Sequence, residues 1–165
     1  MKFSLHWAFF ILHRGVEDIG LFIEVLAGTS AGSKISEMIF KNRFISSILI
    51  NPLTCIDIYY LIRRKSMQER AKEELDKMKK LVRIVPLEEF AELVGEIKVM
   101  TSLSLADAAN IALGEHKNVK VLFKHEHELD DQIAKQVDAP FRSRIVFIDD
   151  FPYYLGDTKK GELIR

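Results

Sequence analysis

The sequence predicts an α/β fold, specifically a three-layer α/β/α sandwich with a mainly parallel central sheet. The first observation is that short apolar or β-branched runs, such as 81–85, 119–123 and 144–148, recur along the chain. The second is that longer segments with helical periodicity alternate with them, as in proteins built from parallel strands and crossover helices. In such a fold, ligands bind beyond the carboxyl ends of the strands.

Each element has its own local signal. Gly28 ends the first expected helix, Asn51 and Pro52 form an N-cap with proline at the first position, Pro86 closes a strand, and Ser104 opens a helix. Helices are expected over 20–28, 31–42, 53–65, 66–80, 87–98, 104–116 and 128–136, and strands over 43–50, 81–85, 119–123 and 144–148.

Composition limits the possible functions. A chain of 165 residues, 48% of them hydrophobic, is expected to form one domain with one core. Its 24 basic and 24 acidic residues leave no net charge, so any nucleic-acid binding must come from a local patch.

The compartment is inferred from two features. Cys55 is the only cysteine, which excludes an intramolecular disulfide and favours a reducing compartment, so we expect a cytoplasmic protein. The N-terminal run LHWAFFIL is much shorter than the roughly 20 residues of a membrane span. We therefore expect no membrane partner, and we interpret this run as a buried strand or short helix.

Three acids stand where helices begin or strands end. Asp18 precedes a helix, Asp107 is the fourth residue of the helix start SLAD, and Glu126 follows the strand VKVLF. Asp57 differs, because it falls on the apolar stripe of its helix. Burying an unpaired charge costs several kcal/mol or more, so a compensating interaction is expected there.

Simpler interpretations of most of these acids stay open. Asp18 would serve as an N-cap, and Asp107 as the acidic partner of a capping box that Ser104 begins. Glu126 and Glu128 would be first-turn acids that the helix dipole favours. Asp57 has no comparable structural explanation.

The segment LFKHEHELDD, residues 122–131, raises the question of a transition-metal site. Zinc requires three or four converging ligands, and this run supplies at most two from one place. We therefore interpret His125 and His127 as surface residues that are solvated or weakly hydrogen-bonded.

Four blocks in order resemble PIN-domain nucleases. DIGLFIEVLAGT resembles the opening helix of that family, and INPLTCIDIYYLIRRK is similar to its second block. SLSLADAANIALGEHKNVKVLFKHEHEL resembles the third and fourth blocks, and size and block order are most similar to VapC-type toxins of archaea or bacteria. The resemblance covers roughly residues 18–150. We expect residues 1–150 to form a single PIN-like domain, with 1–17 as an atypical N-terminal segment and 151–165 as a C-terminal tail.

Three features depart from the family pattern. Ile19 replaces the hydroxyl residue that follows the first Asp, and HRGVE separates the apolar run from Asp18. Asp57 and Glu126 also exchange acid lengths relative to the usual Glu and Asp.

The resemblance implies a site and a reaction. Its metal-binding and catalytic acids would be Asp18, Asp57, Asp107 and Glu126, with Glu128 as a further metal ligand. An oxygen-only ligand set suits Mg²⁺ or Mn²⁺, and the substrate implied by the family is single-stranded RNA.

The resemblance also implies partners. Basic residues that would contact the RNA backbone are Arg63, Arg64, Lys65, Lys117, Lys120 and Lys124, although a solvated face is an equally good interpretation of them. An antitoxin and a homodimer are expected, with ISEMIFKNRF and IDIYYLIRR as the surfaces. The alternatives are a catalytically degraded PIN-like domain that binds RNA or protein, and a module for a phosphorylated ligand, for which no Gly-rich loop is present.

Overall fold

The computed structural model describes residues 15–17, 19–37 and 47–147. In this part of the chain, one sheet contains β1 (Gly15–Glu17), β2 (Ile48–Ile50), β3 (Val82–Ile84), β4 (Lys120–Phe123) and β5 (Ile145–Phe147). The strand order is β3-β2-β1-β4-β5, and every neighbouring pair is parallel. The predicted α/β fold with a parallel sheet is therefore confirmed.

The first described strand lies where the sequence suggested a gap. Gly15–Glu17 falls inside HRGVE and ends directly before Asp18, and it pairs with both β2 and β4. The expectation that HRGVE separates the first strand from Asp18 is thus wrong, because these residues include a strand of the sheet. The run LHWAFFIL lies outside the described residues.

The helices largely follow the predicted segments. They are α2 (Ile19–Ala27), α3 (Ser30–Ser36), α4 (Pro52–Lys65), α5 (Gln68–Lys79), α6 (Ala91–Met100), α7 (Leu105–Lys117), α8 (His127–Gln136) and α9 (Ala139–Arg142), with a 3₁₀ turn η2 (Leu87–Glu89). The side chains of Asn51 and Ser104 cap α4 and α7 as expected. Gly28, with φ of 66°, follows α2.

Two helical segments differ from the expectation. The helix predicted over 87–98 is divided, because Phe90 has a non-helical backbone (φ −142°, ψ 20°) and a buried side chain (4% exposed). α6 starts after it and continues to Met100. α9, which begins with Ala139 and Pro140, was not predicted.

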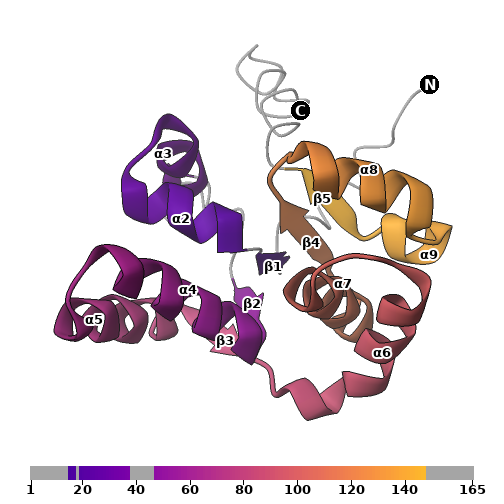
Figure 1. The fold of residues 1–165 in the computed structure, drawn as a ribbon, viewed down its shortest axis with the longest axis horizontal. Coiled ribbons are helices and arrows are strands. Elements are labelled where there is room, and N and C mark those ends of the chain that lie inside the picture. Colours follow the sequence, from indigo (N-terminus) through magenta and orange to yellow (C-terminus); the bar gives the residue numbers. More distant parts are fainter. Residues whose placement is uncertain (1–14, 18, 38–46, 148–165) are drawn as a thin grey trace, which may run out of the picture.

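Hydrophobic residues form two clusters on opposite faces of the sheet. Leu49, Val121 and Phe123 point into a cluster with residues of α6, α7 and α8. Ile48, Ile50 and Leu122 alternate with them and point into a cluster with residues of α2, α3, α4 and α5. Figure 1 shows these two groups of helices on either side of the strands. This is the arrangement that a three-layer sandwich requires. Within the described segments, no helix is long and apolar enough to cross a membrane.

α7 lies very close to β4. A Cβ atom added at Gly114 would stand 2.2 Å from Val121 Cγ2 and 3.3 Å from the Val119 carbonyl oxygen. Val121 is fully buried and β-branched, so its side chain has little freedom to move away. Gly114 therefore sets the distance between this helix and the sheet.

Gly114→Ala is expected to lower the free energy of unfolding by roughly 1–3 kcal/mol, because the added methyl group overpacks the α7–β4 contact. Urea unfolding measures the change. Gly95→Ala is the matched control, since a Cβ at this position of α6 meets no atom within 4 Å. It should stabilise the protein by about 0.5–1 kcal/mol. Equal stabilisation by both variants would contradict the close approach.

Candidate active site

A buried polar network joins α4 to α7 at the carboxyl edge of the sheet. Asn51, which directly follows β2, donates from Nδ2 to Asn110 Oδ1 at 2.7 Å, and Thr54 Oγ1 lies 3.4 Å from the same oxygen. Asn51 Oδ1 accepts from the backbone N–H of Leu53 and of Thr54 at 2.8 and 3.3 Å. Asn51, Thr54 and Asn110 are each at most 1% exposed. The network fixes the start of α4 against the middle of α7.

Asp57 and Asp107 continue this contact by one helical turn. Asp57 follows Thr54 by three residues on α4, and Asp107 precedes Asn110 by three on α7, so each acid lies on the same face as its polar neighbour. Burial raises the pKa of Asp57. Burial is also the main cause that raises the pKa of Asp107, and repulsion from Asp57 raises it further. The carboxylate of Asp57 is therefore close enough to that of Asp107 to act on it electrostatically.

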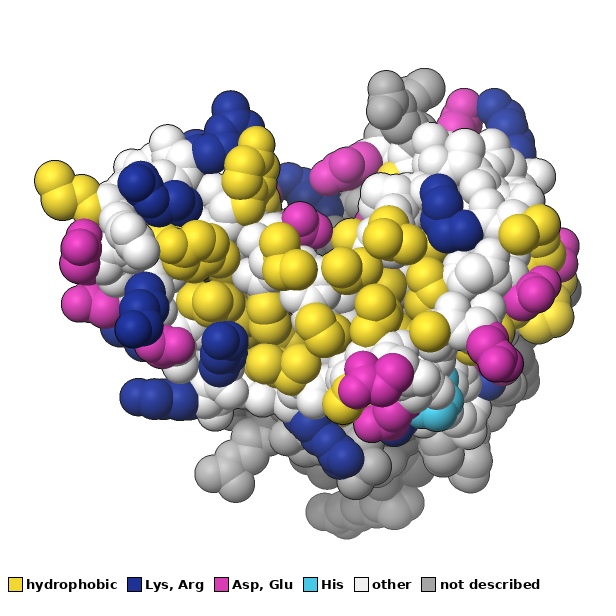
Figure 2. All heavy atoms as spheres, turned by 60° about the horizontal axis from the view of Figure 1, so that its bottom comes forward, with side chains coloured by type: hydrophobic (Ala, Val, Ile, Leu, Met, Phe, Trp, Pro, Cys, Tyr) yellow, Lys and Arg dark blue, Asp and Glu magenta, His cyan; other side chains and the backbone are white. Residues whose placement is uncertain are grey.

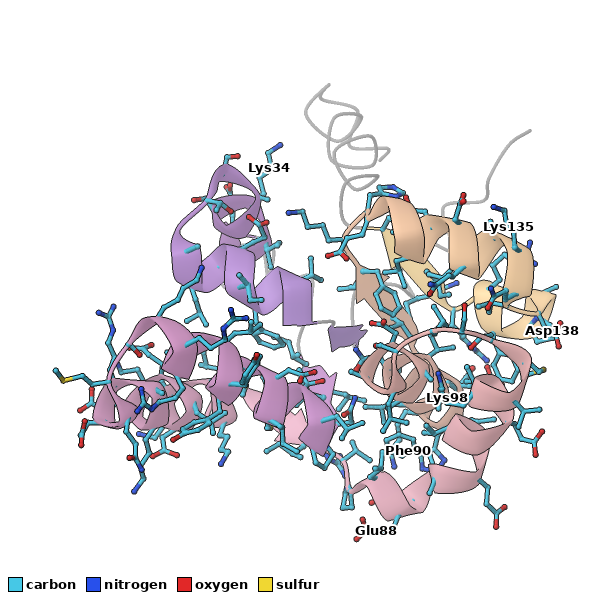
Figure 3. The ribbon with its side chains drawn as sticks, in the orientation of Figure 1. Lys34, Glu88, Phe90, Lys98, Lys135 and Asp138 are labelled. Carbon is cyan, nitrogen blue, oxygen red and sulfur yellow. The ribbon has the colours of Figure 1, made fainter. Side chains whose placement is uncertain are left out.

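Two other groups act on Asp107 in the opposite direction. Ser104 Oγ accepts from the Asp107 backbone N–H at 3.1 Å and donates to Asp107 Oδ2 at 2.5 Å, so the predicted capping box is present alongside the acid pair. Lys98 of α6 also favours the ionised form. Its ammonium donates to the Leu103 carbonyl, and Figure 3 shows it turned in between α6 and α7, whereas Lys34 and Lys135 project outward. Lys98 was not identified from the sequence.

Of the remaining predicted ligands, the structure describes the side chain of Glu126 alone. Asp18 lies outside the described residues, between the last residue of β1 and the first of α2. Glu126 is exposed and is the N-cap residue of α8, without a side-chain capping bond. The side chain of Glu128 lies outside the description too. Among the described residues, no three His, Cys, Asp or Glu side chains form a group that would hold a metal ion.

The basic residues that were predicted to contact RNA do not lie in one place. Lys117 ends α7 and pairs with Glu89 at 2.7 Å, and Lys120 begins β4 and donates to the Ser143 carbonyl. Both are at the amino end of β4, opposite the edge that carries Asp107. Arg63 and Arg64 are exposed in the last turn of α4, where Arg63 Nη1 donates to the Ser66 carbonyl at 2.9 Å and Arg64 lies over the Tyr60 ring.

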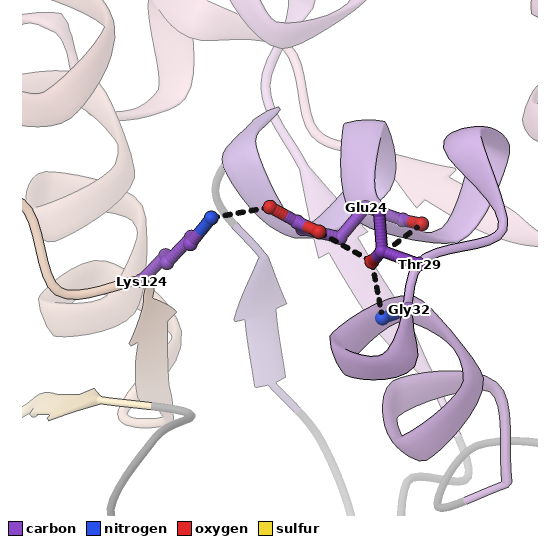
Figure 4. Close-up of polar contacts among 4 residues, drawn as sticks. All are labelled: Glu24, Thr29, Gly32 and Lys124. Carbon is purple, nitrogen blue, oxygen red and sulfur yellow. Dashed lines mark hydrogen bonds and ion pairs between the residues drawn. The ribbon is translucent and has the colours of Figure 1, made fainter.

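Lys124, also predicted to contact RNA, lies at the carboxyl end of β4. It forms an ion pair with Glu24 of α2, and this interaction is the main cause that lowers the pKa of Glu24 (Figure 4). Thr29 Oγ1 donates to the same carboxylate and accepts from the Gly32 N–H at 3.0 Å, which caps α3. Glu24 therefore ties α2, α3 and the end of β4 together.

The interpretation of His125 as a solvated or weakly bonded residue needs correction. Its Nδ1 lies 2.8 Å from Asp130 Oδ2, and its ring stacks on Phe147 with centroids 4.0 Å apart. The spacing of five residues to Asp130 gave no helical signal, because His125 precedes the helix that carries Asp130. The side chain of His127 lies outside the description.

The fold has counterparts among solved structures. No protein-family model matches the chain, and no curated protein matches it. A chain of VapBC2 from Rickettsia felis, bound to a promoter DNA fragment, matches 81% of this chain over 98% of its own length, with a TM-score of 0.61 and 11% identity. The match to DNA-bound VapBC from Salmonella typhimurium covers 82% of this chain and 98% of that one, with a TM-score of 0.61 and 13% identity.

A toxin–antitoxin complex from Klebsiella pneumoniae gives a third match, covering 81% of this chain and 97% of that one, with a TM-score of 0.58 and 14% identity. The chain has a VapC-like PIN fold. At these identities the likeness concerns the fold, and the acid pair has to be argued from its own surroundings.

Asp107→Asn is expected to raise the free energy of unfolding at neutral pH. The raised pKa means that folded Asp107 keeps its proton at pH values where the unfolded chain has lost it, so stability falls as the pH rises through that window. Asparagine avoids this loss and still accepts from Ser104. Urea unfolding across pH measures the difference, which should disappear near about pH 3, where aspartate is protonated in both states.

Asp76→Asn, on the exposed surface of α5, is the control for replacing an aspartate. If Asp107→Asn is no more stable than the parent at neutral pH, the strained acid pair is not present.

Proposed function

We propose that this protein is a metal-dependent endoribonuclease that hydrolyses phosphodiester bonds of single-stranded RNA, as the toxin of a toxin–antitoxin pair. The observation that supports this most is the Asp57–Asp107 pair, held together at the carboxyl edge of a parallel sheet. Two carboxylates with raised pKa values are an unfavourable arrangement for stability alone, and such pairs mark functional sites. The fold shared with VapBC structures supports the toxin assignment.

The donor set fits Mg²⁺ or Mn²⁺. Asp57 and Asp107 offer hard oxygen ligands, and their mutual repulsion would be relieved by a cation between them. Asp18 and Glu126 would complete the site, and Glu128 would be a further metal ligand. Asp18 belongs to the segment that joins the central strand β1 to α2, so its position in the chain suits this role.

When bound, such an ion activates water and stabilises charge on the phosphodiester. The chain's own residues hold the ligands in place. Asn51, Thr54 and Asn110 fix the spacing of the two helices, and Ser104 orients the Asp107 carboxyl group through its 2.5 Å hydrogen bond. Lys98, close enough to influence Asp107, would counter part of the phosphate charge.

We further propose an antitoxin partner and a homodimer. The matched structures are complexes of VapB with VapC or a toxin–antitoxin complex. On α4, Ile56 is 61% and Tyr60 53% exposed, so this helix is not fully enclosed by the core. Figure 2 shows a band of hydrophobic side chains crossing one face, with acidic side chains at its upper margin. The other proposed surface, ISEMIFKNRF, lies mostly outside the described residues.

A degraded PIN-like domain that binds RNA or protein is the second candidate. It is favoured by the exposure of Glu126 and by the presence of only two converging acids among the described residues. Metal titration separates the two candidates, because a degraded domain would bind its partner without a divalent cation.

Mn²⁺ or Mg²⁺ should support cleavage of a short single-stranded oligoribonucleotide, and Asp57→Asn or Asp107→Asn should lower the rate at least about 100-fold, because each removes a metal ligand. Gel analysis of a labelled strand measures cleavage, and calorimetry measures metal binding by the same variants. Asp76→Asn should behave like the parent. Cleavage that persists in chelator, or in Asp107→Asn, would argue against this reaction.

The dimer is tested separately. Light scattering should report a dimer, whose interface is expected to bury well over about 1,000 Å² in total. Ile56→Glu should convert the dimer to a monomer, because it places a charge in the contact. Met67→Glu is the control, because Met67 is 78% exposed but precedes α5 outside the α4 surface. A parent protein that is monomeric at high micromolar concentration would refute the dimer.

A further inference from the structure

The loop after β4 holds an aromatic ring in a fixed orientation. The His125 and Phe147 rings are stacked, with 4.0 Å between centroids and 13° between planes. The hydrogen-bonding contact of 2.8 Å between Nδ1 and Asp130 Oδ2 limits rotation of the imidazole within that plane. The side chain of His125 is nevertheless 39% exposed. One part of the ring is thus covered by Phe147 while another part meets solvent.

The stacked pair lies at the same edge of the sheet as the candidate site. Phe123 and Phe147 are register partners at the carboxyl ends of β4 and β5, and His125 follows Phe123 by two residues. β4 also pairs with β1, whose last described residue directly precedes Asp18. In the sheet β4 lies between β5 and β1, so the stacked pair and the candidate acids share the carboxyl edge of the sheet.

Rings in this situation suit unpaired nucleobases. Proteins that hold single-stranded nucleic acid stack successive bases on aromatic side chains, including histidine. A ring already fixed by a neighbour loses little freedom when a nucleobase covers its exposed part. Lys124, adjacent in sequence, stands at the same carboxyl end of β4 and is paired with Glu24.

We propose that His125, supported by Phe147 and oriented by Asp130, is a base-stacking subsite for an unpaired nucleotide next to the phosphodiester that the acid pair acts on. This inference deepens the proposed function and rests on it. His125 contacts the base, Asp130 is a positioning residue, and the chemistry recognised is the flat face of a nucleobase in single-stranded RNA.

The chain supplies its own comparison. His116 is also stacked on a phenylalanine, Phe90, at 5.9 Å and 27°, and its Nε2 lies 3.5 Å from Glu89. It stands near the end of α7, which at about 1.5 Å per residue is roughly 15 Å from the helix start that carries Asp107. A substitution of His116 therefore changes a similar ring pair away from the candidate site.

The test uses the full chain in chelator and a short single-stranded oligoribonucleotide that contains 2-aminopurine, whose fluorescence is quenched on stacking. His125→Ala should weaken binding about 5- to 150-fold and abolish the quenching. His125→Phe should retain both, because a flat ring remains. Asp130→Asn should reduce the quenching less than His125→Ala does, and His116→Ala should leave binding unchanged.

Parent-like binding by His125→Ala would overturn the proposal, and so would a loss in His125→Phe equal to that in His125→Ala. If the parent binds no RNA, or binds duplex as tightly as the single strand, the subsite is refuted as well. Cleavage is assayed separately with Mn²⁺. A parent protein that binds the strand and quenches its fluorescence but never cleaves would refute the nuclease and leave the stacking subsite intact. A parent protein that cleaves, with a His125→Ala variant that binds normally, would refute the stacking subsite and leave the nuclease intact.

Discussion

The hydrogen bond from Asn51 to Asn110 is the constraint on which the candidate site depends. Both amides are almost completely buried, and the bond joins a helix that packs on one face of the sheet to a helix that packs on the other. A buried amide without its partner costs about 1–3 kcal/mol, so the two helices are held in one register. Asp107 lies one turn before Asn110, and Asp57 lies one turn after Thr54, which also contacts Asn110, so this network positions both acids.

The same constraint explains why the acid pair persists although it is unfavourable. The amide and hydroxyl contacts between Asn51, Thr54 and Asn110 are supplied by neutral groups, so they hold the helices together without neutralising the carboxylates. Burial raises the pKa values of both acids. Proteins commonly accept such a local loss of stability where a ligand will compensate it. A divalent cation is the ligand that we propose to compensate this negative charge.

The sheet also separates positive charge by location. Lys124 leaves β4 at the edge of the candidate site, where it is tied to Glu24, while Lys117 and Lys120 are paired at the opposite edge. These three lysines are within eight residues of one another in sequence. Lys117 and Lys120 nevertheless lie at the amino end of β4, and Lys124 lies beyond its carboxyl end. Lys98, Lys124 and His125 are the groups that we propose RNA would meet near the acid pair.

Local signals were sufficient for much of the fold. Asn51 with Pro52, Ser104 and Gly28 marked helix ends through interactions within a few residues, and the structure has them there. β1 was misplaced because a three-residue strand stabilised by pairing on both sides needs little hydrophobic signal of its own. The same limit applies to the site. Asn110 looked like one polar residue in an apolar helix, and only its contact with Asn51, 59 positions away, reveals its role. The orientation of the His125 ring likewise depends on its stacking against Phe147, which is distant in sequence.

The central claim is that Asp57 and Asp107 hold a divalent cation. A crystal structure of the protein grown with Mn²⁺, with anomalous diffraction collected to locate the metal, tests this claim most directly. The account predicts an anomalous peak between the two carboxylates, within oxygen-ligand distance of both. A peak bound elsewhere, or carboxylates that remain together with no metal at saturating Mn²⁺, would contradict it.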